Sequence, residues 1–361
     1  MFLAYIIYSF IMAIMFLFYK KEGKYMHIIP VILITFLLGN RYNVGIDFPT
    51  YKFDYEHNNV EKYEIIYRII SEFLWTNGFS FYVLLSCTVM VYYLFYYASF
   101  KEIRYIFPYC ILFFMAFGPF TFLLNGIRQA ISFSIFLYSI QYIWKNNFYK
   151  YSLLIVIATG IHSFSLILLP LFLLRYVNFD KLKVIHLLVA YILTLIIGDS
   201  LFERIIAISI DELKSIGYGV YINSLGDNKM TYGTGIGMAI MQSIDIVMLL
   251  YFNKMKSEFL NTPFSIYFGI YFIGLLSYNV VGLDLLGNRA IYCFISVRFI
   301  VAGFMLYYLI KNYFTSPVHK IITCYLFFSS ILLYIANVNG SQNGCSPFYF
   351  NFLSDAHFIL F

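Results

Sequence analysis

The sequence predicts an all-α, polytopic membrane protein with about twelve transmembrane helices. Of its 361 residues, 61% are hydrophobic and only 12% are charged, whereas about 25% are charged in a soluble domain. The mean hydropathy is high, at +0.78. The apolar runs are also continuous, whereas the strands of a membrane barrel would alternate apolar and polar positions over about ten residues. Composition and pattern together exclude a soluble domain and a barrel.

A membrane helix needs about 17–25 apolar residues, and twelve runs come near this length. We expect spans at residues 2–19, 25–39, 79–99, 106–124, 129–144, 150–161, 163–176, 184–198, 235–252, 264–284, 290–310 and 321–337. Lysines follow the first run and none precedes it, so we expect this run to be retained rather than cleaved as a signal peptide. The positive-inside rule then places both termini outside, with every inside loop neutral or basic.

One long loop on the expected outer face covers residues 40–78. It contains an amphipathic stretch, Val60–Trp75, in which apolar residues recur at helical spacing while charged residues such as Glu64 and Arg68 take the other face. We expect this stretch to form a helix that lies in the membrane interface.

A second long outer loop, residues 199–234, starts with a short amphipathic stretch, Leu201–Ile216, and becomes glycine-rich. It lacks the preceding strand and the following Gly-Lys-Ser/Thr of a nucleotide-binding loop. The five cysteines show no disulfide or metal spacing, and the net charge of +6 is spread over short loops. We therefore expect no metal, no cofactor and no nucleic acid, and a single integral-membrane domain over residues 1–361.

An arginine stands in a short polar segment between two expected spans. The segment Asn-Gly-Ile-Arg-Gln, residues 125–129, separates two long apolar runs. A charged side chain within or at the edge of a bilayer costs about 2.5–3.5 kcal/mol, so it normally faces a polar cavity and has a partner. On a helix, Asn125 and Gln129 share a face with Arg128. The segment predicts a polar patch that faces a cavity; the alternative is an arginine at a helix end that extends to the lipid headgroups.

Further polar residues are expected on the same outer face. They are Arg41, Asp47, Tyr51, His162, Ser163, Asn288 and Arg289. Several arginines beside one or two acids favour a ligand with more than one negative charge, because arginine pairs bidentately with phosphate. At a membrane surface this indicates a lipid diphosphate. Structural alternatives stay open: His162 as a core histidine, Asp47 as the start of a turn, and Arg289 as a loop cap.

Three motifs follow one another in the first half of the chain. They are Arg-x-x-x-Gly-x-Asp-Phe-x-x-Tyr at residues 41–51, Asn-Gly-Ile-Arg-Gln at residues 125–129 and His-Ser at residues 162–163. Their order resembles the EpsG family, which is related to Wzy-type polysaccharide (O-antigen) polymerases. The resemblance is clearest over residues 35–175. The chain departs from the family at Phe164, where the family often has alanine.

The resemblance implies an integral-membrane glycosyltransferase with the architecture of the C-type superclass. Such an enzyme would transfer a growing glycan from undecaprenyl diphosphate to a lipid-linked repeat unit, on the periplasmic or external side of the bacterial cytoplasmic (inner) membrane. Its product would be the O-antigen of lipopolysaccharide, a capsule or an exopolysaccharide. The implied partners are undecaprenyl diphosphate-linked oligosaccharides, membrane lipids and a chain-length regulator.

Roles for the polar residues follow from this resemblance. Arg128, Arg289 and Arg41 would bind the donor diphosphate and stabilise its charge as it leaves. His162, which we favour, or Asp47 would accept the proton of the attacking sugar hydroxyl. The remaining substrate-binding candidates are Tyr51, Asn125, Gln129, Ser163 and Asn288. A single displacement would invert the anomeric carbon, while a retaining route with Asp47 as nucleophile stays open.

Two other functions share part of this pattern. A transporter, such as a flippase of lipid-linked oligosaccharides, would carry polar groups at mid-membrane. Asp245 is a candidate proton carrier of that kind, unless it forms an ion pair with Arg298 at similar depth. A glycan ligase would share the donor site and differ only in its acceptor. Because most of the polar groups are expected near the outer face, an enzyme is favoured over a transporter.

Overall fold

The computed structural model describes residues 1–19, 28–213, 235–281, 285–340 and 344–354, and these are almost entirely helical. The predicted class, a helical membrane protein, is confirmed. The chain divides into two compact units. One comprises Met1–Phe172 with Ala302–Phe361, and the other comprises Leu173–Val301.

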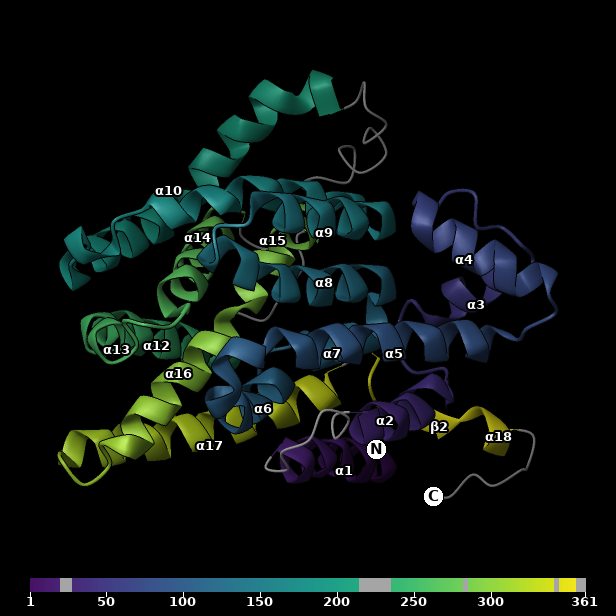
Figure 1. Ribbon diagram of the computed structural model, residues 1–361, viewed down its shortest axis with the longest axis horizontal. Helices are drawn as coiled ribbons and strands as arrows, with labels where there is room; N and C mark the ends of the chain where they lie inside the picture. Colours follow the sequence, from purple (N-terminus) through teal and green to yellow (C-terminus); the bar gives the residue numbers. More distant parts are fainter. Residues whose placement is uncertain (20–27, 214–234, 282–284, 341–343, 355–361) are drawn as a thin grey trace. The chain divides into compact units, whose positions relative to one another are not determined.

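The first unit is built on a layer of apolar helices. Its α-helices are α1 (Phe2–Tyr19), α2 (Ile28–Gly39), α3 (Phe48–Glu56), α4 (Ile65–Thr76), α5 (Phe81–Ser99), α6 (Phe107–Ala116), α7 (Pro119–Asn125), α8 (Ile127–Trp144), α9 (Phe148–Ile161), α17 (Pro317–Asn339) and α18 (Asn351–Ser354). Two 3-10 helices join them, η1 (Lys101–Ile106) and η2 (Ser163–Tyr176). Helix α5 packs against α2 and α8, and α8 packs against α9, so α9, α8 and α5 lie side by side (Figure 1).

The second unit holds the remaining helices. They are η3 (Phe179–Lys181), α10 (Val184–Leu213), α12 (Ile236–Leu250), α13 (Phe252–Glu258), α14 (Phe264–Val281), α15 (Leu285–Ser296) and the start of α16 (Arg298–Lys311). Helix α14 packs against both α10 and α15.

The buried ion pair expected in this unit is confirmed. The Arg298 guanidinium lies 3.0 Å from the Asp245 carboxylate through two of its nitrogens, and the Tyr271 hydroxyl donates to the same carboxylate at 2.8 Å. Asp245 is 1% exposed and Arg298 is 8% exposed. Because an unpaired buried charge is strongly destabilising, the pair explains how both groups are accommodated among apolar helices.

The structure does not support the expected number of twelve spans. In the described part of the chain, four helices are long and apolar enough to cross a membrane: Phe81–Ser99, Phe264–Val281, Arg289–Lys311 and Pro317–Asn339. The number rises to six if two helix pairs, bent by 56° and 54°, each count as one span. Several other expected spans form shorter apolar helices. A helix of 12 residues such as α2 extends about 18 Å, against about 30 Å of hydrocarbon.

The loop after α2 is anchored by the distant C-terminal segment. Strand β1 (Arg41–Tyr42) pairs antiparallel with β2 (Tyr349–Phe350), and the Gly45 amide donates to the Gly344 carbonyl at 2.9 Å. The side chain of Arg41 is fully buried. This pairing over some three hundred residues of sequence determines where the loop between α2 and α5 begins.

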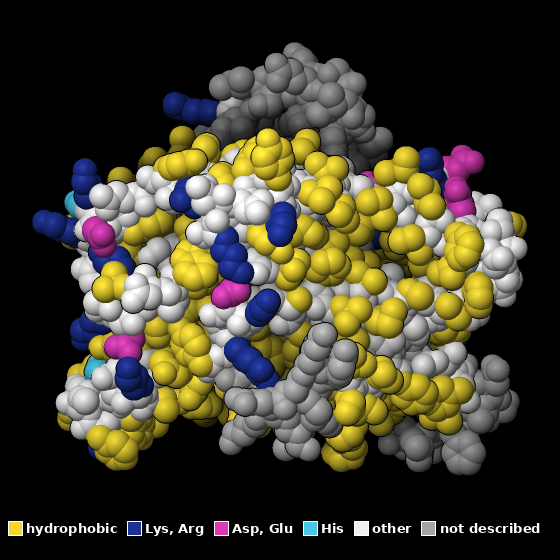
Figure 2. Space-filling view, viewed as in Figure 1, with side chains coloured by type: hydrophobic (Ala, Val, Ile, Leu, Met, Phe, Trp, Pro, Cys, Tyr) yellow, Lys and Arg dark blue, Asp and Glu magenta, His cyan; other side chains and the backbone are white. Residues whose placement is uncertain are grey.

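The outer loops differ from expectation in detail. The amphipathic helix expected at Val60–Trp75 is present, but it starts later, as α4, and α3 precedes it. Ile65, Ile69 and Phe73 of α4 are exposed, while Tyr67 and Leu74 are buried. In the second loop α10 continues to Leu213, and residues 214–234 lie outside the described residues. Hydrophobic side chains cover much of the surface shown in Figure 2, as expected of a membrane-embedded protein.

Candidate active site

Three breaks in helical structure bring the central polar side chains together. Helix α7 ends at Asn125, and Arg128 is the second residue of the next helix, α8. His162 ends α9 with an extended backbone, φ −151° and ψ 116°. Glu64 precedes α4, also with an extended backbone, φ −62° and ψ 152°. Because each side chain sits at a helix terminus rather than within a packed helix face, all three can meet in one place within the first unit.

Glu64 joins the other two. Its Oε2 accepts a hydrogen bond from the Arg128 guanidinium. Its Oε1 lies 3.3 Å from Nδ1 of His162 and accepts from the backbone amide of Ser163 at 3.0 Å. The side chains of Arg128, Glu64 and His162 are 20%, 19% and 13% exposed, so the cluster is largely enclosed yet open at one side. We call Glu64, Arg128, His162 and Ser163 the Glu64 cluster.

The carboxyl of Glu64 is held ionised. Burial alone would raise its pKa, but the hydrogen bond with His162, the charge of Arg128 and the Ser163 amide act in the opposite direction. Together they lower the pKa of Glu64 to about 2. The group is therefore a carboxylate at any pH at which the protein works.

An ionised carboxylate determines the tautomer of its histidine partner. A carboxylate only accepts hydrogen bonds, so Nδ1 of His162 carries the proton in its contact with Glu64. In the neutral imidazole, Nε2 is then the acceptor. A histidine that acts as a general base is typically oriented by a third group, and Glu64 orients His162 in this way.

Three tyrosines surround the Arg128 guanidinium. Its carbon lies 4.3 Å from the ring centroid of Tyr63 and 6.0 Å from those of Tyr51 and Tyr67. Each such contact is worth about 0.5–2 kcal/mol, depending on how dry it is. Tyr51, expected at the site from the sequence, is therefore beside Arg128, and the guanidinium is held from several directions.

The position of Tyr63 depends on a buried acid in α3. Asp54, 2% exposed, accepts from the Tyr63 hydroxyl, from Lys62 at 2.9 Å and from Asn59 at 3.3 Å. These contacts bind the segment between α3 and α4 to α3. They hold Tyr63 and the adjacent Glu64 against the start of α8.

Arg41 has a different place from the one expected of a diphosphate ligand. It is 0% exposed, and its guanidinium donates to the backbone carbonyls of Leu38 at 2.8 Å, Leu124 at 3.3 Å and Val44 at 3.4 Å. It thus joins the end of α2, the following loop and the end of α7. Burial lowers its pKa, to about 10.

Asp47 and Asn125 lie at the same junction. The Asn125 side-chain oxygen accepts from the Asp47 backbone amide at 2.8 Å, and Asp47 precedes α3 without capping it through its side chain. Gln129, one residue after Arg128 in α8, is 5% exposed. The structure therefore brings the first two sequence motifs into direct contact through Asn125.

The last two candidates lie on α15, in the second unit. Asn288 and Arg289 occur in the first turn and a half of that helix. Their relation to the Glu64 cluster stays a prediction.

Glu64 itself was not among the residues expected at the site. The sequence did indicate a carboxylate partner for Arg128, because an arginine at a bilayer edge needs one. The polar face of the predicted interfacial helix carries several carboxylates, and Glu64 is one of them. Nothing in the sequence separations, 64 residues to Arg128 and 98 to His162, selects Glu64 over the others. Within the described ranges, no three His, Cys, Asp or Glu side chains lie close enough together to hold a metal ion.

The cluster offers a cation for an anionic group and a carboxylate–histidine pair for proton transfer. These are the parts of a group-transfer site.

In comparisons with known proteins, no curated protein and no solved structure matches the chain. The model of the EpsG family, whose members are Wzy-like polymerases, matches residues 24–350. Since this match covers nearly the whole chain, the protein belongs to the EpsG family.

Proposed function

We propose that this protein is a polysaccharide polymerase that transfers a glycan from undecaprenyl diphosphate to a lipid-linked repeat unit at the outer face of the cytoplasmic membrane. Family membership indicates a polymerase-like role in O-antigen or exopolysaccharide assembly. The observation that carries the proposal is the Glu64 carboxylate, which contacts both the Arg128 guanidinium and the His162 imidazole.

The donor diphosphate binds at Arg128. In the cluster, one oxygen of Glu64 accepts a hydrogen bond from the guanidinium, as a phosphate oxygen would. Phosphate and carboxylate make the same bidentate contacts with arginine, so the arriving diphosphate takes the place of Oε2. The tyrosines at 4.3–6.0 Å keep the guanidinium in position during this exchange. The positive charge then stabilises the diphosphate as it leaves the sugar.

The other oxygen of Glu64 keeps its own contacts during the exchange. Oε1 is held by the Ser163 amide and by Nδ1 of His162, and neither contact involves Arg128. His162 therefore remains oriented, with Nε2 ready to accept the proton of the attacking sugar hydroxyl. A single displacement by that hydroxyl inverts the anomeric carbon.

The remaining candidate residues take supporting roles. Arg41, enclosed by backbone carbonyls, and Asn125, bonded to the Asp47 amide, hold the loop that leads into α3, the helix that carries Tyr51. Asp47 is the alternative base, or nucleophile if the reaction retains configuration. Arg289 is a further candidate for the donor diphosphate, and Gln129, Ser163 and Asn288 are candidates for other parts of the two lipid-linked substrates.

The proposal is tested with purified protein in lipid nanodiscs and undecaprenyl diphosphate-linked repeat units, with products resolved as a ladder on a gel. Arg128→Ala should abolish the ladder, and Arg128→Lys should restore little of it, because an ammonium does not reproduce the planar fork. Arg68→Ala is the matched control, since Arg68 lies on α4 and pairs only loosely with Glu72, at 3.9 Å. A near-normal ladder from Arg128→Ala would contradict the proposal.

A further inference from the structure

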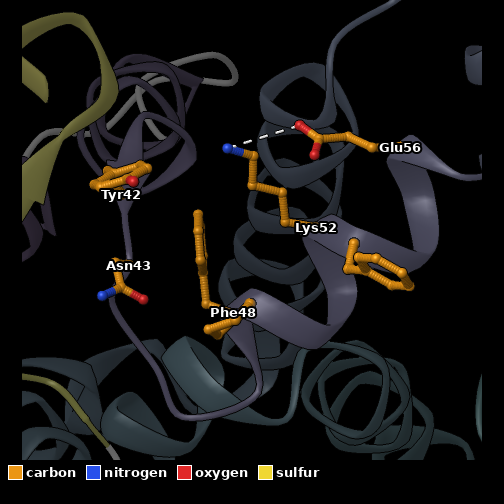
Figure 3. A pocket seen from close by; sticks show the side chains of 7 residues that line it. Tyr42, Asn43, Phe48, Lys52 and Glu56 are labelled. Carbon is orange, nitrogen blue, oxygen red and sulfur yellow. Dashed lines mark ion pairs between the residues drawn. The ribbon is translucent and has the colours of Figure 1, made fainter. Parts of the chain in front are cut away.

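A small pocket lies between α3 and the segment that follows α2 (Figure 3). Its volume is about 200 Å³. One wall is the end of β1 and the residue that follows it, Tyr42 and Asn43, and the other is α3, with Phe48, Lys52 and Glu56.

The floor and walls of the pocket are aromatic. The rings of Tyr42 and Phe48 meet nearly at right angles, 75°, with centroids 6.1 Å apart. Phe48 is 2% exposed and forms the buried end. Phe53, 57% exposed, stands at the rim, where its ring stacks on His57 at 4.1 Å.

The polar edge of the pocket is an ion pair and an amide. The Lys52 ammonium lies 3.7 Å from the Glu56 carboxylate and 5.4 Å from the centre of the Tyr42 ring. With one cation and one anion, the lining carries no net charge. Asn43 adds an amide that can donate and accept.

The walls are also fixed in advance of binding. The first wall is held by the three carbonyl contacts of Arg41, by the β1–β2 pairing and by the bond from Gly45 to Gly344. Helix α3 is held by the buried Asp54. A ligand would therefore spend little of its binding free energy on ordering this site.

We propose that this pocket binds one sugar residue of the glycan chain. A pyranose ring has an apolar face of C–H groups and an edge of hydroxyl groups, which match the aromatic walls and the Lys52–Glu56 edge. A phosphate would meet the carboxylate of Glu56, and a prenyl chain would desolvate both charges of the ion pair at a cost. The lining therefore selects a neutral, hydroxyl-rich ligand.

The place of the pocket on α3 indicates which sugar it holds. Tyr51, which contacts Arg128, directly precedes Lys52, so the two side chains point to different sides of one helix. The pocket therefore lies on a different side of α3 from the proposed diphosphate site. It would hold a sugar residue other than the reacting one, and this assignment rests on the proposed function.

Binding is measured by saturation-transfer difference NMR on the full-length protein in nanodiscs. The probe is the repeat-unit oligosaccharide freed from its lipid by mild acid. Phe53→Ala and Glu56→Gln should each weaken binding by about tenfold, the value of one stacked ring or one charge-assisted hydrogen bond. Both side chains are exposed at the rim, so the fold should tolerate the changes. Ile69→Ala, an equally exposed residue of α4 (55%), is the control and should bind normally.

The possible outcomes separate this inference from the proposed function. Arg128→Ala should lose polymer but keep oligosaccharide binding, because Arg128 does not line the pocket. If the wild type binds the oligosaccharide and the pocket variants do not, while no polymer forms, the pocket assignment stands and the polymerase proposal fails. If the wild type binds no oligosaccharide, if Phe53→Ala and Glu56→Gln bind as the wild type does, or if they change only pyrophosphate binding, the assignment is overturned.

Discussion

At the scale of single residues, Glu64 is the group on which the site depends. It holds the cation proposed for the donor and the imidazole proposed for the acceptor, through different oxygens. A residue with two such contacts can release one while keeping the other. This explains how a site enclosed by Glu64 would admit a substrate without losing the orientation of its base.

The pKa of Glu64 makes a prediction about stability against pH. Because the folded-state pKa, about 2, lies below its ordinary value of 4.5, the ionised carboxylate stabilises the fold at any pH above about 4.5. That contribution is lost as the pH falls from about 4.5 towards 2. Glu64→Gln lacks the charge at every pH. The melting temperatures of the wild type and of Glu64→Gln should differ most above pH 5 and converge towards pH 2.

Thermal unfolding in detergent, followed by intrinsic fluorescence, measures this difference. The control is Glu61→Gln, a change at an exposed neighbour outside the cluster, which should melt with the wild type throughout. A melting difference for Glu64→Gln that is the same at pH 7 and at pH 3 would show that the charge of Glu64 is not the cause.

A second prediction at this scale separates the two candidate bases. His162→Gln should lower the polymerisation rate by about 10²–10⁴-fold, the usual contribution of a general base, with little change in donor binding. Asp47→Asn should cost less, because His162 is the proposed base and the bond from the Asp47 backbone amide to Asn125 is retained. Initial rates on lipid-linked repeat units, with donor binding measured separately, test both. A nearly normal rate from His162→Gln beside an inactive Asp47→Asn that still binds donor would reverse the assignment.

At the scale of elements, the site depends on the loop between α2 and α3 being held against the α7–α8 junction. The loop approaches the end of α7 most closely at Gly45. Its φ is +100°, and a Cβ there would lie 2.1 Å from the Leu124 carbonyl oxygen, which is backbone and cannot move away cheaply. Leu124 directly precedes Asn125, so a displaced loop would also disturb the bond to Asp47.

Gly45→Ala should therefore lower both the amount of folded protein in the membrane and the activity of what remains. Gly78→Ala is a matched control, because Gly78 also has positive φ, +74°, but no atom lies within 4 Å of the position that its new methyl group would take. It should cost only the backbone penalty of about 1–2 kcal/mol. Membrane levels by immunoblot and polymer per molecule measure the two effects. Equal losses in both variants would show that close packing at Gly45 is unimportant.

At the scale of the whole molecule, the charge pattern of the sequence predicts which side of the membrane each loop faces. The charge pattern places Glu61 in an outer loop and Tyr149 in an inside loop. Both side chains are exposed, Tyr149 by 88%. In intact cells, a membrane-impermeant thiol reagent should label Glu61→Cys and leave Tyr149→Cys unlabelled, against a wild-type background that includes the exposed Cys324.

After permeabilisation, Tyr149→Cys should become labelled, which shows that its thiol is reactive. Labelling of Tyr149→Cys before permeabilisation would invert the orientation or change the number of spans. It would also place the Glu64 cluster on the inner side, where the proposed donor and acceptor would not meet it.

The sequence alone determined the class of the protein and the order of its polar motifs. Continuous apolar runs can satisfy their backbone groups in a membrane only as helices, so the helical class follows from local composition. The motifs at residues 41–51, 125–129 and 162–163 pointed to the family. The Asp245–Arg298 pair was also predictable, because two lone opposite charges among apolar helices must neutralise each other.

The tertiary structure decided which of these residues meet. Arg41 and Arg128 look alike in the sequence, yet one is enclosed by backbone carbonyls and the other faces Glu64. The number of helices long enough to cross a membrane also differed from expectation, since apolar runs of similar composition end in helices of different length. Side-chain environment depends on contacts between residues far apart in the chain. No local pattern encodes those contacts, so Glu64 became visible only in the folded protein.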